Sequence, residues 1–70
     1  MSYESSSQKA LYNHTLTHTF WPDGYVHTSL YNAEGWFVTK AEGYTNPGEG
    51  IADVICRNND AIYDEKGWVA

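Results

Sequence analysis

The sequence predicts an α+β fold: a three-stranded antiparallel meander with one helix packed on its aliphatic face and a short C-terminal hairpin. Three features of the chain lead to this prediction. Short turns end in a glycine followed by a large aromatic residue, apolar and polar residues alternate strictly between turns, and an apolar stripe with helical period comes later. A small all-β fold is the alternative, because the short apolar run at 51–57 fits a strand as well as a helix.

The N-terminal segment shows neither period. Residues 2–9 are polar and rich in serine, and such a segment at a chain end is typically loosely ordered. A chain of 70 residues is long enough for one domain at most. We therefore expect a flexible N-terminal arm over residues 1–12 and a single small domain over residues 13–70.

Four turns share the glycine-aromatic ending. A type I turn followed by a glycine in the left-handed conformation closes a three-residue hairpin loop, and an aromatic residue suits the start of the returning strand. The four turns are Pro22-Asp23-Gly24-Tyr25, Ala33-Glu34-Gly35-Trp36, Ala41-Glu42-Gly43-Tyr44 and Glu65-Lys66-Gly67-Trp68. We expect these glycines to have positive φ.

The first two turns set the register of the meander. If Trp21 and Tyr25 face each other across the first loop, and the second loop is treated in the same way, Leu30 lies between Leu16 and Val38. The aliphatic face then collects Leu16, Phe20, Val26, Leu30, Trp36 and Val38. The opposite face collects Thr17, Thr19, Trp21, Tyr25, His27, Ser29, Tyr31 and Phe37.

A helix is predicted to cover the aliphatic face. Asn46 can cap it, Pro47 suits the first helical position, and Glu49 favours the first turn. The apolar stripe consists of Ile51, Val54, Ile55 and Ile62. Because asparagine is a poor helix former, we expect the helix to end at 58–59, leaving two short strands at 61–64 and 68–70.

Composition limits the classes of function. Cys56 is the only cysteine, which fits a reducing compartment. The chain has no apolar run that suits a signal peptide or a membrane span, so we expect a cytoplasmic protein without a membrane partner. Nine acidic and four basic residues give a net charge of −5, which argues against direct binding of nucleic acid.

The residues capable of chemistry do not form a recognisable set. His14 and His18 are expected on the aliphatic face and His27 on the other, whereas zinc needs converging ligands. Cys56 lies in an apolar run, where cysteine usually acts as a small hydrophobic residue. The glycine-rich stretch 43–50 lacks the Lys-Ser/Thr ending of a phosphate-binding loop. We expect no metal, no cofactor and no enzymatic activity.

Two groups of residues are candidates for binding. The first is the aromatic face of the meander, where rings can anchor a protein interface or, alternatively, form core beneath another element. Its residues are Trp21, Tyr25, His27, Tyr31 and Phe37.

The second group is acidic. If residues 49–64 formed one helix, its members would lie within an arc of about 60° and extend over roughly 22 Å. They are Glu49, Asp53, Asp60 and Asp64. Such a row can imitate the phosphates of a nucleic acid strand; a solvated helix face is the alternative.

These features predict a small acidic, non-enzymatic protein that binds and inhibits a larger protein. In length, acidity and lack of a catalytic set, the chain resembles the small inhibitory proteins that bacteriophages and mobile elements encode, including DNA mimics and anti-CRISPR proteins. The likeness is one of composition and covers no motif. It implies docking on a basic surface and blocked access of nucleic acid. The alternative is a homodimeric structural or interaction module, with its aromatic faces buried between subunits.

Overall fold

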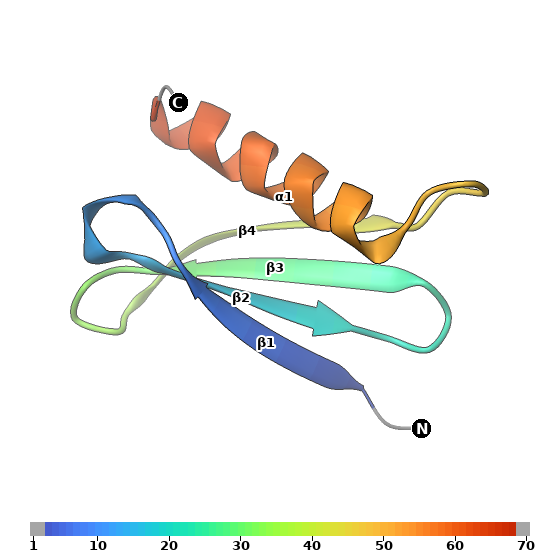
Figure 1. Cartoon of the computed structure of the whole chain (residues 1–70). Coiled ribbons are helices and arrows are strands. Elements are labelled where there is room, and N and C mark those ends of the chain that lie inside the picture. The colour runs from blue at the N-terminus through green and yellow to red at the C-terminus, as the bar shows by residue number, and fades with distance from the viewer. Residues whose placement is uncertain (1–2, 69–70) are drawn as a thin grey trace.

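The structure, a computed structural model that describes residues 3–68, is a four-stranded antiparallel sheet with one helix across one face (Figure 1). The elements are β1 (Glu4–Lys9), a 3-10 turn (Leu11–Asn13), β2 (Thr15–Phe20), β3 (Tyr25–Tyr31), β4 (Phe37–Tyr44) and α1 (Ile51–Lys66). The strands lie in the order β1-β2-β3-β4, so each pairs with its neighbour in the sequence. The α+β class is confirmed, and the meander has four strands where we predicted three.

The additional strand, β1, lies in the segment that was expected to be an arm. It pairs with β2 along its whole length, from Glu4 opposite Phe20 to Lys9 opposite Thr15. All six of its side chains are exposed. Since neither face of β1 is buried, its sequence needs no apolar alternation, and the period that reveals a half-buried strand is absent.

The two predicted hairpin loops are confirmed. Gly24 has a φ of 94° and Gly35 a φ of 91°, in the left-handed region that favours glycine. The N–H of Trp21 donates to the carbonyl oxygen of Tyr25 at 2.9 Å. The predicted register of β2 with β3 is also confirmed, including Leu16 opposite Leu30.

The register of β3 with β4 differs from the prediction by one residue. An irregularity at Leu30 and Tyr31 places Leu30 opposite Thr39, while Tyr31 pairs with Phe37. Val38 is the extra residue, and its partly buried side chain packs against the core. Trp36, which was expected on the aliphatic face, is 72% exposed. It belongs to the hairpin loop, because β4 begins one residue later, at Phe37.

The third predicted turn is wrong, since residues 41–44 continue strand β4. Gly43 lies opposite Val26 within the ladder. A Cβ at this position would come within 3.3 Å of Nη2 of Arg57. The glycine therefore leaves room for the Arg57 side chain beside β4 rather than closing a loop.

The helix begins and ends later than predicted. Its N-cap is Gly50, not Asn46, so the proline at 47 precedes the helix. At the other end, Gly67 has a φ of 76°, and the N–H of Trp68 donates to the carbonyl oxygen of Tyr63 at 2.8 Å. This is the hydrogen-bond pattern of a glycine helix cap. The predicted C-terminal hairpin is therefore wrong, as is the all-β alternative; residues 69–70 lie outside the described residues.

The helix also continues through the two asparagines that were expected to stop it. Asn58 is only 3% exposed, and its Nδ2 donates to the carbonyl oxygen of Val26 at 3.3 Å and to Oγ1 of Thr28 at 3.4 Å. These bonds form only when the helix lies on the sheet. Tertiary contacts thus override the weak helix propensity of asparagine.

The core lies between α1 and one face of the sheet. Its fully buried apolar residues are Leu16, Val26, Leu30, Val54 and Ile62. Two residues of the predicted helical stripe contribute less: Ile55 is half-buried, and Ile51 is 52% exposed, at the rim of the sheet beside Phe20 and Pro22.

A chain of polar side chains crosses this core. Nδ2 of Asn58 donates to Thr28, the Thr28 hydroxyl donates to Nδ1 of His18 at 3.0 Å, and Nε2 of His18 donates to Oε1 of Gln8 at 2.6 Å. Because the amide oxygen of Gln8 can only accept, Nε2 of His18 carries a proton. Burial lowers the pKa of His18 and so favours the neutral ring, whose Nδ1 accepts the Thr28 hydroxyl hydrogen. This polar chain of hydrogen-bonded side chains connects α1 to β3, β2 and β1.

Candidate functional site

The two faces of the sheet differ in what covers them. Figure 1 shows α1 lying across one face, and within residues 3–68 no helix or strand lies on the other. We call this second face the open face. Side chains alternate between the faces along each strand, so the open face takes its residues from the positions between the buried ones.

An aromatic row crosses the open face at one end, formed by Tyr3, Trp21, Tyr25 and Tyr44. The ring centroids of Tyr3 and Trp21 lie 4.9 Å apart, and those of Tyr25 and Tyr44 lie 5.1 Å apart. Trp21 and Tyr25 face each other across the first hairpin loop. With strands about 4.8 Å apart, the row extends over roughly 14 Å and includes a residue from each strand or its immediate end.

Polar side chains occupy the middle of the open face in two further rows, each about 7 Å from the next. The first consists of Ser5, Thr19, His27 and Glu42, and the second of Ser7, Thr17, Ser29 and Lys40. At the far end the rings of Tyr31 and Phe37 meet at 6.0 Å. The open face thus has rings at both ends and hydrogen-bonding groups between them.

A shallow hollow of about 440 Å³ lies where the aromatic row meets the first polar row. Its lining residues are Tyr3, Thr19, Trp21, Tyr25, His27, Lys40 and Glu42. The rings supply most of the apolar wall, and Glu42 supplies a carboxylate. We call this hollow the ring hollow.

The polar groups of the ring hollow interact with one another. The hydroxyl of Tyr25 donates to the carboxylate of Glu42, and both side chains line the hollow. Nζ of Lys40 lies 4.0 Å from the same carboxylate, and both side chains are about half exposed. Burial, followed by the positive charge of Lys40, lowers the pKa of His27, so its imidazole is neutral at pH 7.

The structure brings together three of the predicted aromatic-face residues, Trp21, Tyr25 and His27, in the ring hollow. The other two, Tyr31 and Phe37, lie at the far end of the same face. Sequence reasoning missed Tyr3 and Tyr44.

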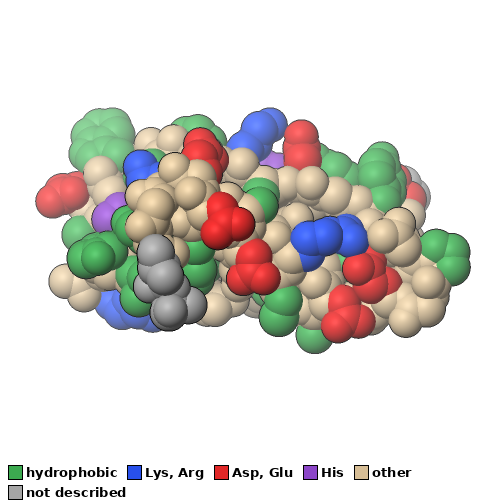
Figure 2. Space-filling view, turned by 90° about the horizontal axis from the view of Figure 1, so that it is seen from above, with side chains coloured by type: hydrophobic (Ala, Val, Ile, Leu, Met, Phe, Trp, Pro, Cys, Tyr) green, Lys and Arg blue, Asp and Glu red, His purple; other side chains and the backbone are tan. Residues whose placement is uncertain are grey.

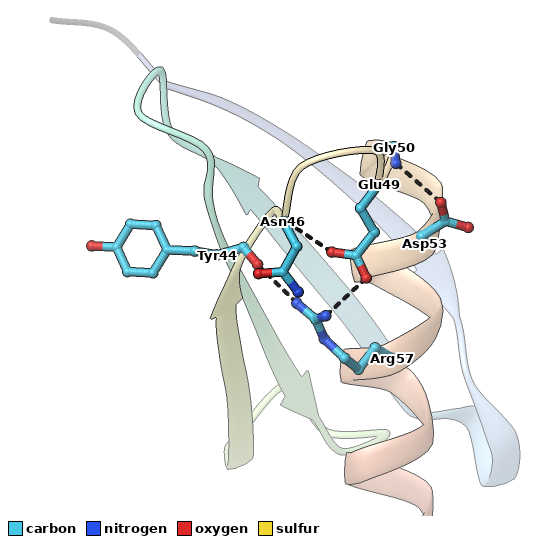
Figure 3. Close-up of polar contacts among 6 residues, drawn as sticks. All are labelled: Tyr44, Asn46, Glu49, Gly50, Asp53 and Arg57. Carbon is cyan, nitrogen blue, oxygen red and sulfur yellow. Dashed lines mark hydrogen bonds and ion pairs between the residues drawn. The ribbon is translucent and has the colours of Figure 1, made fainter.

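The acidic candidates belong to the helix side, and two of them serve the start of the helix (Figure 3). Glu49 precedes the helix and forms an ion pair with Arg57 at 2.8 Å. The same arginine donates to the carbonyl oxygen of Tyr44 at 2.9 Å. Oδ2 of Asp53 accepts the N–H of Gly50 at 3.0 Å. These two carboxylates therefore hold the helix to β4 and cap its first turn.

The remaining two, Asp60 and Asp64, are exposed. Because α1 is continuous, these residues and Asp53 lie within an arc of about 40°. Figure 2 shows acidic side chains distributed over the helix side of the molecule. The acidic and aromatic candidates thus lie on opposite sides of a molecule whose shortest extent is 15 Å.

The histidines and the cysteine are placed apart from one another. His18 is buried in the core, His27 lies on the open face, and Nδ1 of His14 is 3.1 Å from the carbonyl oxygen of Tyr12. Cys56 is exposed on α1 rather than packed in the core. Among residues 3–68 no three side chains of the metal-binding types are grouped closely enough to hold an ion.

Comparison of the chain with protein-family models, curated proteins and solved structures found no match. In the part of the chain that the structure describes, no helix has both the length and the apolar character needed to cross a membrane.

Proposed function

We propose that the protein is a small non-enzymatic binding module that docks with its open face on a basic surface of a larger protein. The observation that supports this most is the aromatic row: Trp21 is 40% exposed, Tyr3 56% and Tyr44 58%, side by side on a face that no described element covers. Tyrosine and tryptophan are the residues that most often dominate binding energy in protein interfaces.

Charge supports the choice of a basic partner. The net charge of −5 attracts a basic surface over a distance comparable to the Debye length, about 10 Å at 0.1 M salt. The acids of α1 contribute to this field, although they lie on the far side of the thin molecule. They steer the approach, and the rings make the contact.

Inhibition is the proposed consequence of docking. A basic protein surface large enough to receive the open face is the kind of surface that binds nucleic acid through its phosphates. An acidic protein seated there blocks that access. Inhibition can be tested only with the partner in hand, so the test of inhibition comes after the test of binding.

The binding test uses matched tryptophan variants as bait in extracts of the source cells. We expect the wild-type protein and Trp36→Ala, which changes an exposed ring in the second hairpin loop, to retain the same partner. Trp21→Ala should lose it. The partner is then produced separately, and its affinity and its binding of nucleic acid are measured with and without the protein.

Charge is tested with the same purified partner. Asp60→Lys combined with Asp64→Lys should slow association and weaken its salt dependence, because both carboxylates are exposed. Glu49 and Asp53 are unsuitable for this purpose, since reversing either charge disturbs the start of the helix.

Two results would overturn the proposal. One is a set of retained proteins that does not differ between Trp21→Ala and Trp36→Ala. The other is a stable dimer at micromolar concentration in native mass spectrometry, with the open face protected from hydrogen exchange. The second result would assign the protein to the alternative class, a homodimeric interaction module.

A further inference from the structure

We propose that the ring hollow receives a cationic side chain, an arginine or a lysine, from the partner protein. This inference rests on the proposed function, because it gives the basic surface a point of attachment. The hollow combines the two groups that attract an organic cation: the faces of aromatic rings and a carboxylate.

The rings are the first part of the argument. A cation within about 6 Å of a ring centroid is attracted by the negative face of the ring, and tryptophan is the best of the three aromatic residues for this purpose. Tyr3, Trp21 and Tyr25 all line the hollow, with Tyr3 tilted 35° from the plane of the tryptophan ring. A cation that enters the hollow therefore meets more than one ring.

The carboxylate is the second part. Glu42 lines the same hollow and accepts the hydroxyl hydrogen of Tyr25, so its negative charge lies beside one of the rings that line the hollow. An arginine could bind the remaining lone pairs of the carboxylate while its planar group stacks on a ring.

Lys40 does not already satisfy this site. Its ammonium lies 4.0 Å from the carboxylate, at the limit of an ion pair, and its side chain is 54% exposed. Exposed pairs of this kind contribute little, about 0 to 1 kcal/mol. A ligand cation that also contacts the rings can therefore replace the lysine.

Other ligand classes fit less well. An anion would meet Glu42 and the net charge of −5. His27 does not offset this, because burial and Lys40 lower its pKa and keep it neutral at pH 7. A neutral ligand such as a sugar can stack on the rings and donate hydroxyl hydrogens to Glu42, but it carries no charge for either to attract, so a charged and a neutral probe of the same shape separate the two classes.

The test is a titration of the ¹⁵N-labelled protein with N-acetyl-arginine amide, followed by NMR. The matched neutral probe is N-acetyl-citrulline amide, which has nearly the same shape and no charge. We expect the arginine probe to shift the indole signal of Trp21 and the backbone signals of Tyr25, His27 and Glu42, with millimolar affinity. The citrulline probe should bind at least about fivefold more weakly.

Substitutions then assign the effect to the hollow. Glu42→Gln keeps the shape of the side chain and should weaken arginine binding by about two- to fivefold, whereas Glu34→Gln, in the second hairpin loop, should not change it. Trp21→Leu should remove binding. Trp21→Leu also changes the hairpin, so the NMR spectrum of this variant must retain the signal dispersion of the folded protein. If the variant is unfolded, the assignment to the hollow depends on Glu42→Gln alone.

Three results would overturn the inference: equal affinity for the charged and neutral probes, unchanged affinity in Glu42→Gln, or shifts confined to the exposed acids of α1. The experiment uses no partner protein. If it fails while the Trp21→Ala bait loses the partner, docking by the open face stands without a cation in the hollow. If the probe binds while no partner is found, the hollow is confirmed and the proposed function is not.

Discussion

The two faces of the sheet differ in coverage: α1 packs on one, and no described helix or strand lies on the other. On the face under α1, Leu16 and Leu30 are completely buried, and the buried polar side chains of His18, Thr28 and Asn58 have hydrogen-bond partners in the core. On the open face, rings are left half exposed across all four strands. Stability therefore depends on the covered face, and the proposed function places binding on the open face, so substitutions on the two faces should have separable effects.

The strongest test of this separation is a pair of large-to-small substitutions on the two faces. Leu30→Ala should reduce the free energy of unfolding by roughly 2 to 5 kcal/mol, because it removes buried contacts and leaves a cavity. Phe37→Ala, on the open face, should cost about 1 kcal/mol or less, the value of its contact with Tyr31. Chemical denaturation of both variants measures the difference. Equal losses would mean that the open face is part of the core.

A smaller effect is expected within the helix, where two neighbouring asparagines differ in their surroundings. Asn58→Ala removes the donor to Val26 and Thr28 and should cost about 1 to 3 kcal/mol, since a buried acceptor loses its partner. Asn59→Ala should cost less or stabilise the protein, because Oδ1 of Asn59 is buried without a hydrogen-bond partner among the described residues. Thermal melts of the two variants decide this. A larger loss in Asn59→Ala would contradict the role given to the polar chain.

The hairpin loops belong to neither face. Substitution of their glycines should change the free energy of unfolding through backbone strain alone. At Gly35 an added Cβ would meet no atom within 4 Å, yet its φ is 91°. Gly35→Ala should therefore destabilise the protein by about 1 kcal/mol through strain only, and Gly24→Ala by a similar amount. Equilibrium unfolding measures both. Melting midpoints that do not move in either variant would show that the loops are built differently.

The smallest expected effect is a dependence of stability on pH that comes from the covered face. Burial lowers the pKa of His18 below its usual value of 6.5. The unfolded chain thus takes up a proton more readily than the folded protein, and stability falls as the pH decreases from about 6.5 towards the lower folded pKa. Above about pH 6.5 this effect is absent.

A pair of histidine substitutions, one on each face of the sheet, provides the control for the pH experiment. His18→Gln should flatten the dependence, although it also shortens the polar chain. His27→Gln on the open face should change it less, because that ring is only partly buried. Urea unfolding between pH 5 and 8 measures the slope. A slope that persists unchanged in His18→Gln would assign the effect to other groups.

Those parts of the fold that depend on local chemistry were predictable. The loop closed by Gly24 and the alternation on both sides of it specify the pairing of β2 with β3, including Leu16 opposite Leu30. The contacts involved are close in the sequence, so the residues themselves carry the signal.

The parts that were missed depend on partners far away in the chain. Asn58 is helical because Val26 and Thr28 receive its amide hydrogens, and nothing within a few residues of it indicates this. Gly43 looked like a turn residue, but its place in β4 reflects the approach of Arg57 from the helix.

The errors in the candidate site follow from the same cause. Trp21, Tyr25 and His27 were found because the first hairpin was read correctly. Tyr3 and Tyr44 were not, because the first was assigned to a flexible arm and the second to a turn. Once both flanking segments are strands, the cross-strand register aligns all four rings of the aromatic row.

Strand β1 has a consequence for how copies of the chain behave in concentrated solution. Within residues 3–68 it forms one edge of the sheet, and an edge is where a second chain can add a strand and begin to aggregate. Its sequence consists of hydroxyl and amide side chains between Glu4 and Lys9, all of them exposed. A chain added there would gain backbone hydrogen bonds but bury no apolar side chain and would desolvate charges at both ends. The polar edge thus opposes the addition of a second copy of the chain at β1.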